Sequence, residues 1–359
     1  MTAADIENII ILLFIFILLI CGAKRRFFPV VRNKSVWSLL LIDKKTSIVI
    51  KGIACVFVLM GHYGTWLINS EREVGVITTI VTHTTANIAL TWFMFFSGFG
   101  LSLKIYENCF FLRNCVKRVS KIYLPLLYVC ICASLLYLIL PYYEHLSGFS
   151  SWYDNIHILG KESWGPLIYQ ILGLSDWYVV CIIYYVLLFY LSAFISIKWK
   201  CNVSLVLGVL LLCYIVAAFF VYGPPQAHFY RYPWVFMLGH LVATHKNNAK
   251  WINISLLLLF SFTWCLLDKI CIFCFIIALI LLASFSLISQ RYDYNGRYLL
   301  FLGGVSYFFY LSHQRIGWFL LLFLDFNYTS VIGWVFITIL CSILLDKGYN
   351  YITSNIKQS

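Results

Sequence analysis

Charged residues make up only 11% of this 359-residue sequence, whereas a typical soluble domain contains about 25%. Hydrophobic residues reach 62%, against roughly 45–50% in soluble domains. This shortage of charge excludes a water-soluble enzyme, a disordered protein and a nucleic-acid-binding protein with a basic surface. Apolar runs fill most of the chain, so the composition predicts a polytopic, all-α membrane protein.

Several patterns that indicate other kinds of chemistry are also missing. The sequence contains no Walker, G-x-S-x-G or G-x-G-x-x-G motif, and no group of side chains has metal-ligand spacing. The thirteen cysteines lie mainly in apolar stretches, and no predicted external loop carries a pair of them. We therefore expect neither a metal cofactor nor a disulfide framework.

A membrane-spanning helix needs about 20 mostly apolar residues. Asp5 and Glu7 stand where a signal peptide carries basic residues, so the first apolar stretch is expected to be a helix that is retained. The predicted fold is a membrane helix bundle of about eleven spans. These are residues 6–21, 48–68, 78–102, 122–141, 177–197, 202–222, 231–244, 251–268, 270–289, 299–323 and 330–345, of which the seventh is short.

The net charge of +12 has a topological explanation. With these spans, twenty of the 26 basic residues fall on one side of the membrane, and ten of the fourteen acidic residues fall on the other. Because cytoplasmic loops are enriched in Lys and Arg, we predict an external N-terminus and a cytoplasmic C-terminus. The chain then divides into an N-terminal helix with a basic cytoplasmic loop (1–47), a membrane domain (48–345) and a cytoplasmic tail (346–359).

Polar residues inside the predicted spans are the best candidates for function, because a charge at mid-span costs roughly 2.5–3.5 kcal/mol. Lys51 and His62 lie eleven residues apart in the second span, which is about 16 Å along a helix. His62 and His313 lie at equal depth, each about 21 Å above the cytoplasmic end of its span. A neutral histidine can act as a general base. Equal depth indicates one shared site, although coincidence or simple hydrogen bonding to neighbouring helices would give the same pattern.

Two further clusters lie near the membrane surfaces. Arg118 and Lys121 stand at the cytoplasmic mouth of the fourth span, where paired bases suit a phosphate-bearing ligand. An ordinary positive-inside anchor is the alternative. Trp177, Tyr178 and Arg231 stand near the outer face, where they would suit a sugar, but an interfacial aromatic belt has the same composition.

In this order, the clusters resemble the motifs of the membrane acyltransferase-3 family, which mostly O-acetylates cell-surface polysaccharides. Lys51 and Lys121 stand where the family usually has arginines, and lysine lacks bidentate recognition of phosphate. The family usually has ten spans, so residues 6–21 would be an extra helix before a ten-helix acyltransferase core. The stretches that carry the resemblance are Lys51-Gly52-Ile53-Ala54 to Gly61-His62, Phe93 to Phe99 with Ser97, Arg118-x-x-Lys121-Ile122 with Pro125, Arg231-Tyr232-Pro233 to Gly239, and Gly303, Val305, Ser306 and Tyr307 with His313.

The resemblance implies transfer of an acyl group, most simply from cytoplasmic acetyl-CoA, to a hydroxyl of an extracytoplasmic or lipid-linked glycan. It implies a bacterial plasma membrane, with membrane lipid as a neighbour, and it leaves a homo-oligomer open. His62 would serve as base or transient acyl carrier. The remaining assignments are Lys51, Arg118 and Lys121 for the phosphates of the donor, and His313, Arg231, Trp177, Tyr178 and Ser97 for the acceptor and the developing oxyanion.

Other classes of membrane protein share some of these features. A transporter or flippase for a glycan or lipid-linked sugar would also have many spans, a basic inner face and an aromatic outer face, but it predicts repeats that are not visible here. A polysaccharide polymerase would be expected to carry arginines in a large external loop, and residues 142–166 contain none. A structural scaffold would have little reason to retain intramembrane charges such as Lys51 and Arg315.

Overall fold

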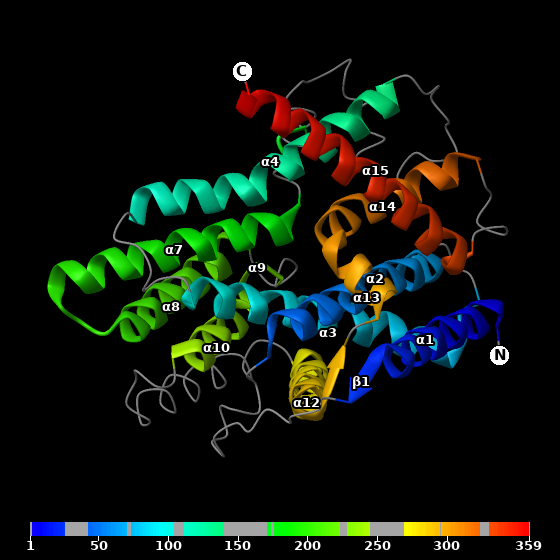
Figure 1. Ribbon diagram of the computed structural model, residues 1–359, viewed down its shortest axis with the longest axis horizontal. Helices are drawn as coiled ribbons and strands as arrows, with labels where there is room; N and C mark the ends of the chain where they lie inside the picture. Colours follow the sequence, from blue (N-terminus) through cyan, green and yellow to red (C-terminus); the bar gives the residue numbers. More distant parts are fainter. Residues whose placement is uncertain are drawn as a thin grey trace.

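The computed structural model describes residues 2–25, 42–69, 73–103, 111–138, 171–173, 176–222, 228–244, 269–294, 296–323 and 330–358. Within these ranges the chain is almost entirely helical, with one pair of three-residue strands (Figure 1). Seven of the described helices are long and apolar enough to cross a membrane. The chain is therefore an all-α, multi-pass membrane protein, as the composition predicts.

The described elements are as follows in chain order. They are α1 (Ala3–Gly22), β1 (Ala23–Arg25), α2 (Lys44–Asn69), α3 (Val76–Ser102), α4 (Phe111–Leu138), α7 (Trp177–Trp199), α8 (Val203–Tyr222), α9 (His228–Arg231), α10 (Pro233–Thr244), α12 (Lys269–Arg291), β2 (Tyr292–Tyr294), α13 (Arg297–Gly304), α14 (Ser306–Phe323) and α15 (Val331–Gln358).

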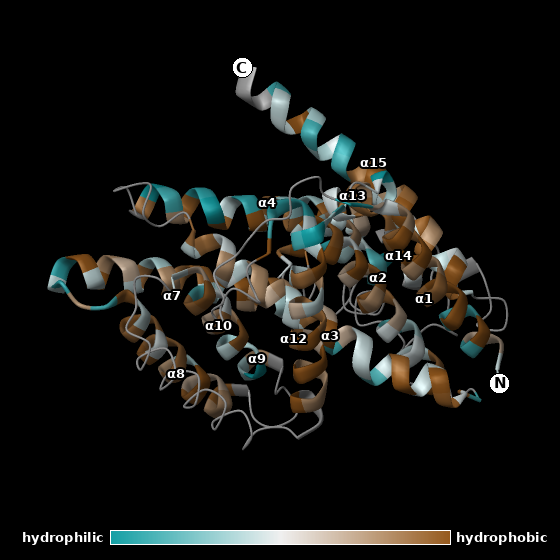
Figure 2. Cartoon of the chain, turned by 60° about the horizontal axis from the view of Figure 1, so that its bottom comes forward, coloured by the Kyte–Doolittle hydropathy of each residue, from teal (hydrophilic) through white to brown (hydrophobic). Residues whose placement is uncertain are grey.

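Most predicted spans coincide with one of these helices, but some of the helices differ from the predicted spans in extent. The predicted span 299–323 is broken at Val305 into α13 and α14, and α15 continues as a helix through most of the predicted tail. The short span 231–244 corresponds to α10, and 251–268 lies outside the described residues. Figure 2 shows hydrophilic residues at the start of α4 and the end of α15, the two helix ends that the charge distribution assigns to the cytoplasm.

The break at Val305 follows a close crossing of α13 and α2. A Cβ on Gly52 would lie 2.9 Å from the backbone nitrogen of Gly303, so the two backbones can approach only because both residues are glycine. Beyond the break, the thiol of Cys55 donates a hydrogen bond to the Ser306 carbonyl at 3.0 Å. The end of α13 and the start of α14 are thus both fixed to α2.

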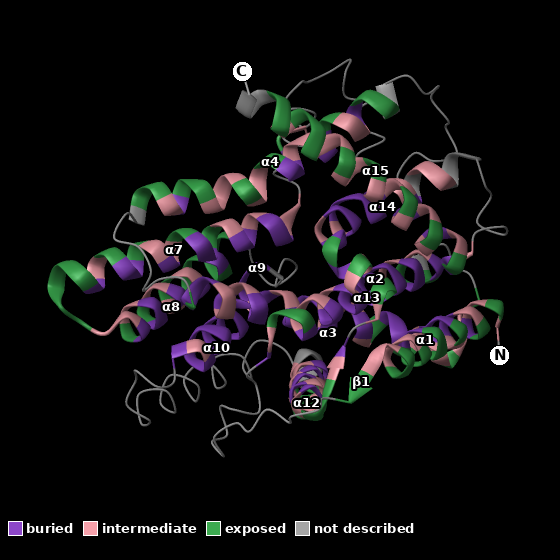
Figure 3. Cartoon of the chain, in the orientation of Figure 1, coloured by how far each residue is buried: buried purple, intermediate pink, exposed green. Residues whose placement is uncertain are grey.

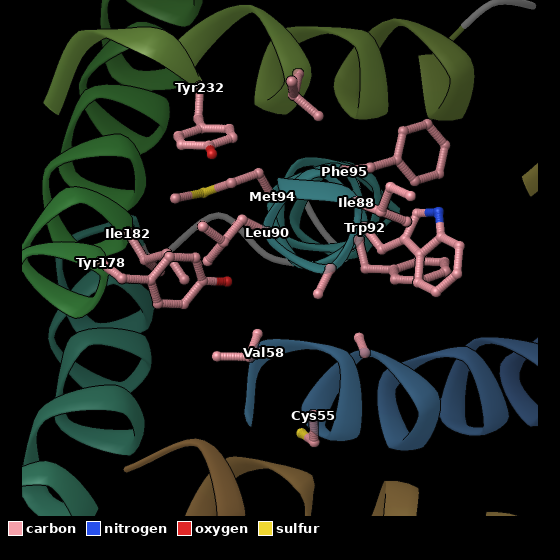
Figure 4. Packing of buried hydrophobic residues seen from close by; sticks show 14 of the residues in the cluster. Cys55, Val58, Ile88, Leu90, Trp92, Met94, Phe95, Tyr178, Ile182 and Tyr232 are labelled. Carbon is pink, nitrogen blue, oxygen red and sulfur yellow. The ribbon is translucent and has the colours of Figure 1, made fainter. Parts of the chain in front are cut away.

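Helix α3 is the centre of the bundle and packs against α2, α10 and α12 (Figures 3 and 4). Looking along this helix, Figure 4 shows Trp92 and Phe95 on one side and Leu90 and Met94 on the other, all buried. Helix α3 contains six threonines. The hydroxyls of Thr82, Thr85 and Thr91 are satisfied within the helix, because each donates to the carbonyl four residues earlier at 2.7–2.8 Å.

A second close crossing joins α3 to α10. A Cβ on Gly98 would collide with the Phe236 carbonyl oxygen, and one on Gly239 would collide with the backbone of α3. Just beyond this contact, the buried His240 lies 2.8 Å from the Ser102 hydroxyl and 2.9 Å from the Ser204 hydroxyl. The sequence suggested no constellation around His240, yet its ring joins α3, α8 and α10.

Helix α1 is attached to the bundle at both ends. The Asp5 carboxylate accepts hydrogen bonds from the backbone nitrogen and the hydroxyl of Thr78, both at 2.8 Å, and so caps the start of α3. The Glu7 carboxylate accepts from the Val331 nitrogen at 2.8 Å and caps the start of α15. At the opposite end of α1, β1 pairs with β2. At each end of α1, these contacts join segments that the charge distribution assigns to the same face.

The α3–α10 crossing gives a stability prediction with a matched control on the same helix. Gly98→Ala should destabilise the protein by about 1–3 kcal/mol, because the new methyl group has no space. Gly100→Ala should be neutral or stabilise by up to about 1 kcal/mol, because its Cβ would meet no atom within 4 Å. Thermal unfolding of the detergent-solubilised variants measures the difference, and equal midpoints would contradict the packing argument.

Candidate active site

A cavity of about 260 Å³ lies between α2, α3, α4, α7 and α14. It brings together five of the residues that the sequence singled out, although these come from four different helices. They are Lys51, Ser97, Arg118, Lys121 and Tyr178, and the lining is completed by Phe93, Phe96, Leu101, Ile122, Ile182, Val186, Ser306, Tyr307 and Tyr310.

The cavity extends along the helices. Tyr178, Ile182 and Val186 line it on successive turns of α7, which corresponds to about 12 Å. The three basic residues belong to the first part of α2 and to α4. Lys51 is half-buried, and its ammonium group lies 5.6 Å from the centre of the Phe96 ring, a cation–π contact. A positive charge is therefore held against an otherwise largely aromatic and aliphatic lining.

Three aromatic rings form a layer at one end of the cavity, which we call the aromatic layer. The centroid of Tyr310 lies 4.8 Å from that of Tyr178 and 6.0 Å from that of Phe93. On its other side, Tyr310 contacts His313 with 5.5 Å between ring centroids. The aromatic layer therefore lies between the cavity and His313.

His62 and His313 lie side by side, with 5.1 Å between ring centroids. The juxtaposition predicted from their equal depth is thus confirmed. The Nδ1 atom of His313 lies 2.5 Å from the Tyr310 carbonyl oxygen, and the His313 carbonyl accepts a 2.8 Å hydrogen bond from the Trp334 indole. Gln314 approaches His62 from α14, and sequence reasoning missed it. Its position directly after His313 was the only signal.

A buried ion pair lies beside the histidines. Arg315 donates to the Asp176 carboxylate at 2.5 Å and to the Cys130 sulfur at 3.3 Å. The sequence placed Arg315 inside a span and Asp176 at the outer face without pairing them. A charge inside a membrane protein generally has a partner, so the intramembrane arginine was itself a signal that an acidic residue should be near.

Four of the nine predicted site residues are not part of the cavity lining, namely the two histidines, Trp177 and Arg231. Trp177 packs behind Tyr178 at 5.9 Å and stacks on Tyr232 at 6.2 Å. Arg231 is the last residue of α9 and directly precedes Tyr232. The structure therefore brings the basic residues, Ser97 and Tyr178 together, places the histidines beyond the aromatic layer, and leaves Arg231 outside the cavity.

The fold and the site define a multi-pass membrane protein with a mostly apolar cavity inside its helix bundle, to which three basic residues contribute. The acyltransferase domain of the acyltransferase-3 family matches residues 46–345, most of the chain. The protein therefore belongs to this family and is a membrane acyltransferase. No curated protein and no solved structure matches the chain. The matched region starts within α2, so α1 lies outside it.

The buried ion pair predicts a specific pattern of stability. Asp176→Asn or Arg315→Met should each destabilise the protein by about 3–5 kcal/mol, because each leaves one buried charge without its partner. The double variant should lose much less stability than the sum of the losses in the two single variants. Thermal unfolding in detergent would measure this coupling. Additive losses would show that the two side chains stabilise the bundle independently.

Proposed function

We propose that this protein transfers an acetyl group from acetyl-CoA to a hydroxyl of an extracytoplasmic or lipid-linked glycan. The observation that carries the proposal is the path from Lys51, Arg118 and Lys121, through one cavity, to the aromatic layer beneath the histidine pair. This path combines basic groups suited to phosphate with a histidine base. Lys51 and His62 are about 16 Å apart along their helix, a distance that a long thioester-bearing arm would bridge.

The donor would enter from the cytoplasmic side. Its phosphates would interact with the basic residues, as anionic groups do with Lys and Arg. A cavity of about 260 Å³ is smaller than the roughly 300–1,000 Å³ of pockets that enclose drug-sized ligands. It would therefore hold the arm and its thioester, while the nucleotide part stays at the cytoplasmic surface.

The chemistry would take place at the histidine pair. The acceptor oxygen would attack the thioester carbonyl carbon while an imidazole takes its proton. In an alternative order, the imidazole of His62 would first carry the acyl group and then pass it to the hydroxyl. Donors directed at the developing oxyanion would lower the barrier by several kcal/mol. Neither route requires a metal ion.

The acceptor would be bound on the extracytoplasmic side of a bacterial plasma membrane. This orientation follows from the charge distribution, and the contacts of α1 agree with its grouping of segments, because they join segments assigned to the same face at each end. Trp177 and Tyr232 would offer stacked aromatic faces to a sugar, with Arg231 beside them. Family membership favours transfer over transport as the use of this site.

The first test is the ester content of the surface glycan of the producing cell. Cells that lack the protein should lose base-labile O-acetyl groups, and the wild-type gene should restore them. His62→Ala should fail to restore them at equal protein abundance, because the reacting group is gone. An unchanged ester content with altered glycan export would instead identify a transporter.

The donor site gives a second test with a matched control on α4. Arg118→Gln should raise the KM for acetyl-CoA about tenfold to a hundredfold, because a charge-assisted hydrogen bond contributes about 1.5–3 kcal/mol. Lys117→Gln removes an equal charge from an exposed neighbour that does not line the cavity, and should leave the KM unchanged. Equal effects of the two substitutions would point to a diffuse surface potential instead of a donor site.

A further inference from the structure

The two histidines differ in the hydrogen bonds that their ring nitrogens make. Nδ1 of His313 lies 2.5 Å from the Tyr310 carbonyl oxygen. A carbonyl oxygen can only accept, so the proton of the neutral ring must be on Nδ1. This contact fixes the tautomer and leaves the lone pair of His313 on Nε2.

The Nε2 atom of His313 has no hydrogen-bond partner among the described residues, although the side chain is only 3% exposed. Buried polar atoms are nearly always paired, so an unpaired acceptor calls for an explanation. Its neighbours do not supply one, because the Arg315 guanidinium on the same helix is directed to Asp176 and Cys130. A proton from a bound hydroxyl group would satisfy this lone pair.

His62 is in the opposite situation. The side-chain nitrogen of Gln314 lies 3.0 Å from its Nδ1 and 3.1 Å from its Nε2. An amide nitrogen can only donate, and whichever ring nitrogen of neutral His62 carries the lone pair lies within its reach. The lone pair of His62 is therefore occupied, and its remaining ring function is an N–H donor.

We propose that His313 Nε2 is the proton acceptor of the reaction, that His62 donates its N–H to the thioester oxygen, and that Gln314 is a positioning residue for His62. This rests on the acetyl transfer proposed above. The acceptor oxygen bonds to the carbonyl carbon as its proton passes to Nε2, and the C–S bond then breaks. The leaving thiolate takes the proton from Nε2, which yields an O-acetyl ester and free CoA and restores the neutral ring.

The test uses membrane vesicles from the producing cell, which contain the native acceptor, supplied with radiolabelled acetyl-CoA. Label in base-labile material is measured at saturating donor. His313→Gln should lower this rate about 10²–10⁴-fold with an unchanged KM for acetyl-CoA, because it removes the base. His62→Gln keeps an N–H donor, so its rate should stay within about tenfold of wild type. His62→Leu removes the donor and should lower the rate about 10²–10³-fold. The exposed His83→Gln is the matched control and should behave as wild type.

The ranking of these variants decides the proposal. It is overturned if His62→Gln is as inactive as His62→Leu while His313→Gln keeps its rate, since His62 would then be the base or acyl carrier. Absence of base-labile label with the wild-type protein would instead overturn the acetyl transfer itself. The two failures are therefore distinguishable.

The role of Gln314 is tested by a double-mutant cycle. Gln314→Leu should lower the rate about tenfold without changing the KM for acetyl-CoA, and should have no further effect when His62 is already leucine. A residue with only a structural role would lower the rate in both backgrounds, and that outcome would remove Gln314 from the proposal.

Discussion

A polar group inside an apolar bundle must find its hydrogen-bond partner within the protein, because the hydrocarbon region of a bilayer offers none. This requirement accounts for most polar contacts in the structure. Thr82, Thr85 and Thr91 of α3 donate to their own helix, His240 joins two serines from different helices, and Arg315 pairs with Asp176. The contacts of His240 and Arg315 also fix one element against another, so these polar groups contribute to how the apolar helices are arranged.

The same requirement distinguishes the candidate site from the rest of the bundle. Lys51 lines the cavity with its ammonium group over the face of the Phe96 ring, and Nε2 of His313 is buried without a partner among the described residues. Groups of this kind are costly unless a ligand satisfies them. They lie on the two sides of the aromatic layer, which is the arrangement expected for a donor that enters from one side and an acceptor that meets it at the other.

Much of the fold could be predicted from the sequence, because span length and loop charge are local properties. The His62–His313 pair was also accessible, since depth in a span can be counted along the chain. The break at Val305 could not be predicted, because it depends on Gly52 and Gly303 meeting from distant elements. The Asp176–Arg315 pair and the contact of Gln314 with His62 were missed for the same reason, since they join residues 139 and 252 positions apart.

Helix α1 shows that the pairing of polar groups within the bundle also involves residues outside the family domain. It lies outside the matched residues 46–345, yet its carboxylates cap the starts of α3 and α15. Helix α3 contributes Phe93 and Ser97 to the cavity lining. Helix α15 contributes Trp334, whose indole donates a hydrogen bond to the His313 carbonyl. An unpaired helix start carries partial positive charge, and a carboxylate placed there is stabilising. The additional helix therefore fixes two elements on which the geometry of the site depends, although it contributes no residue to the cavity.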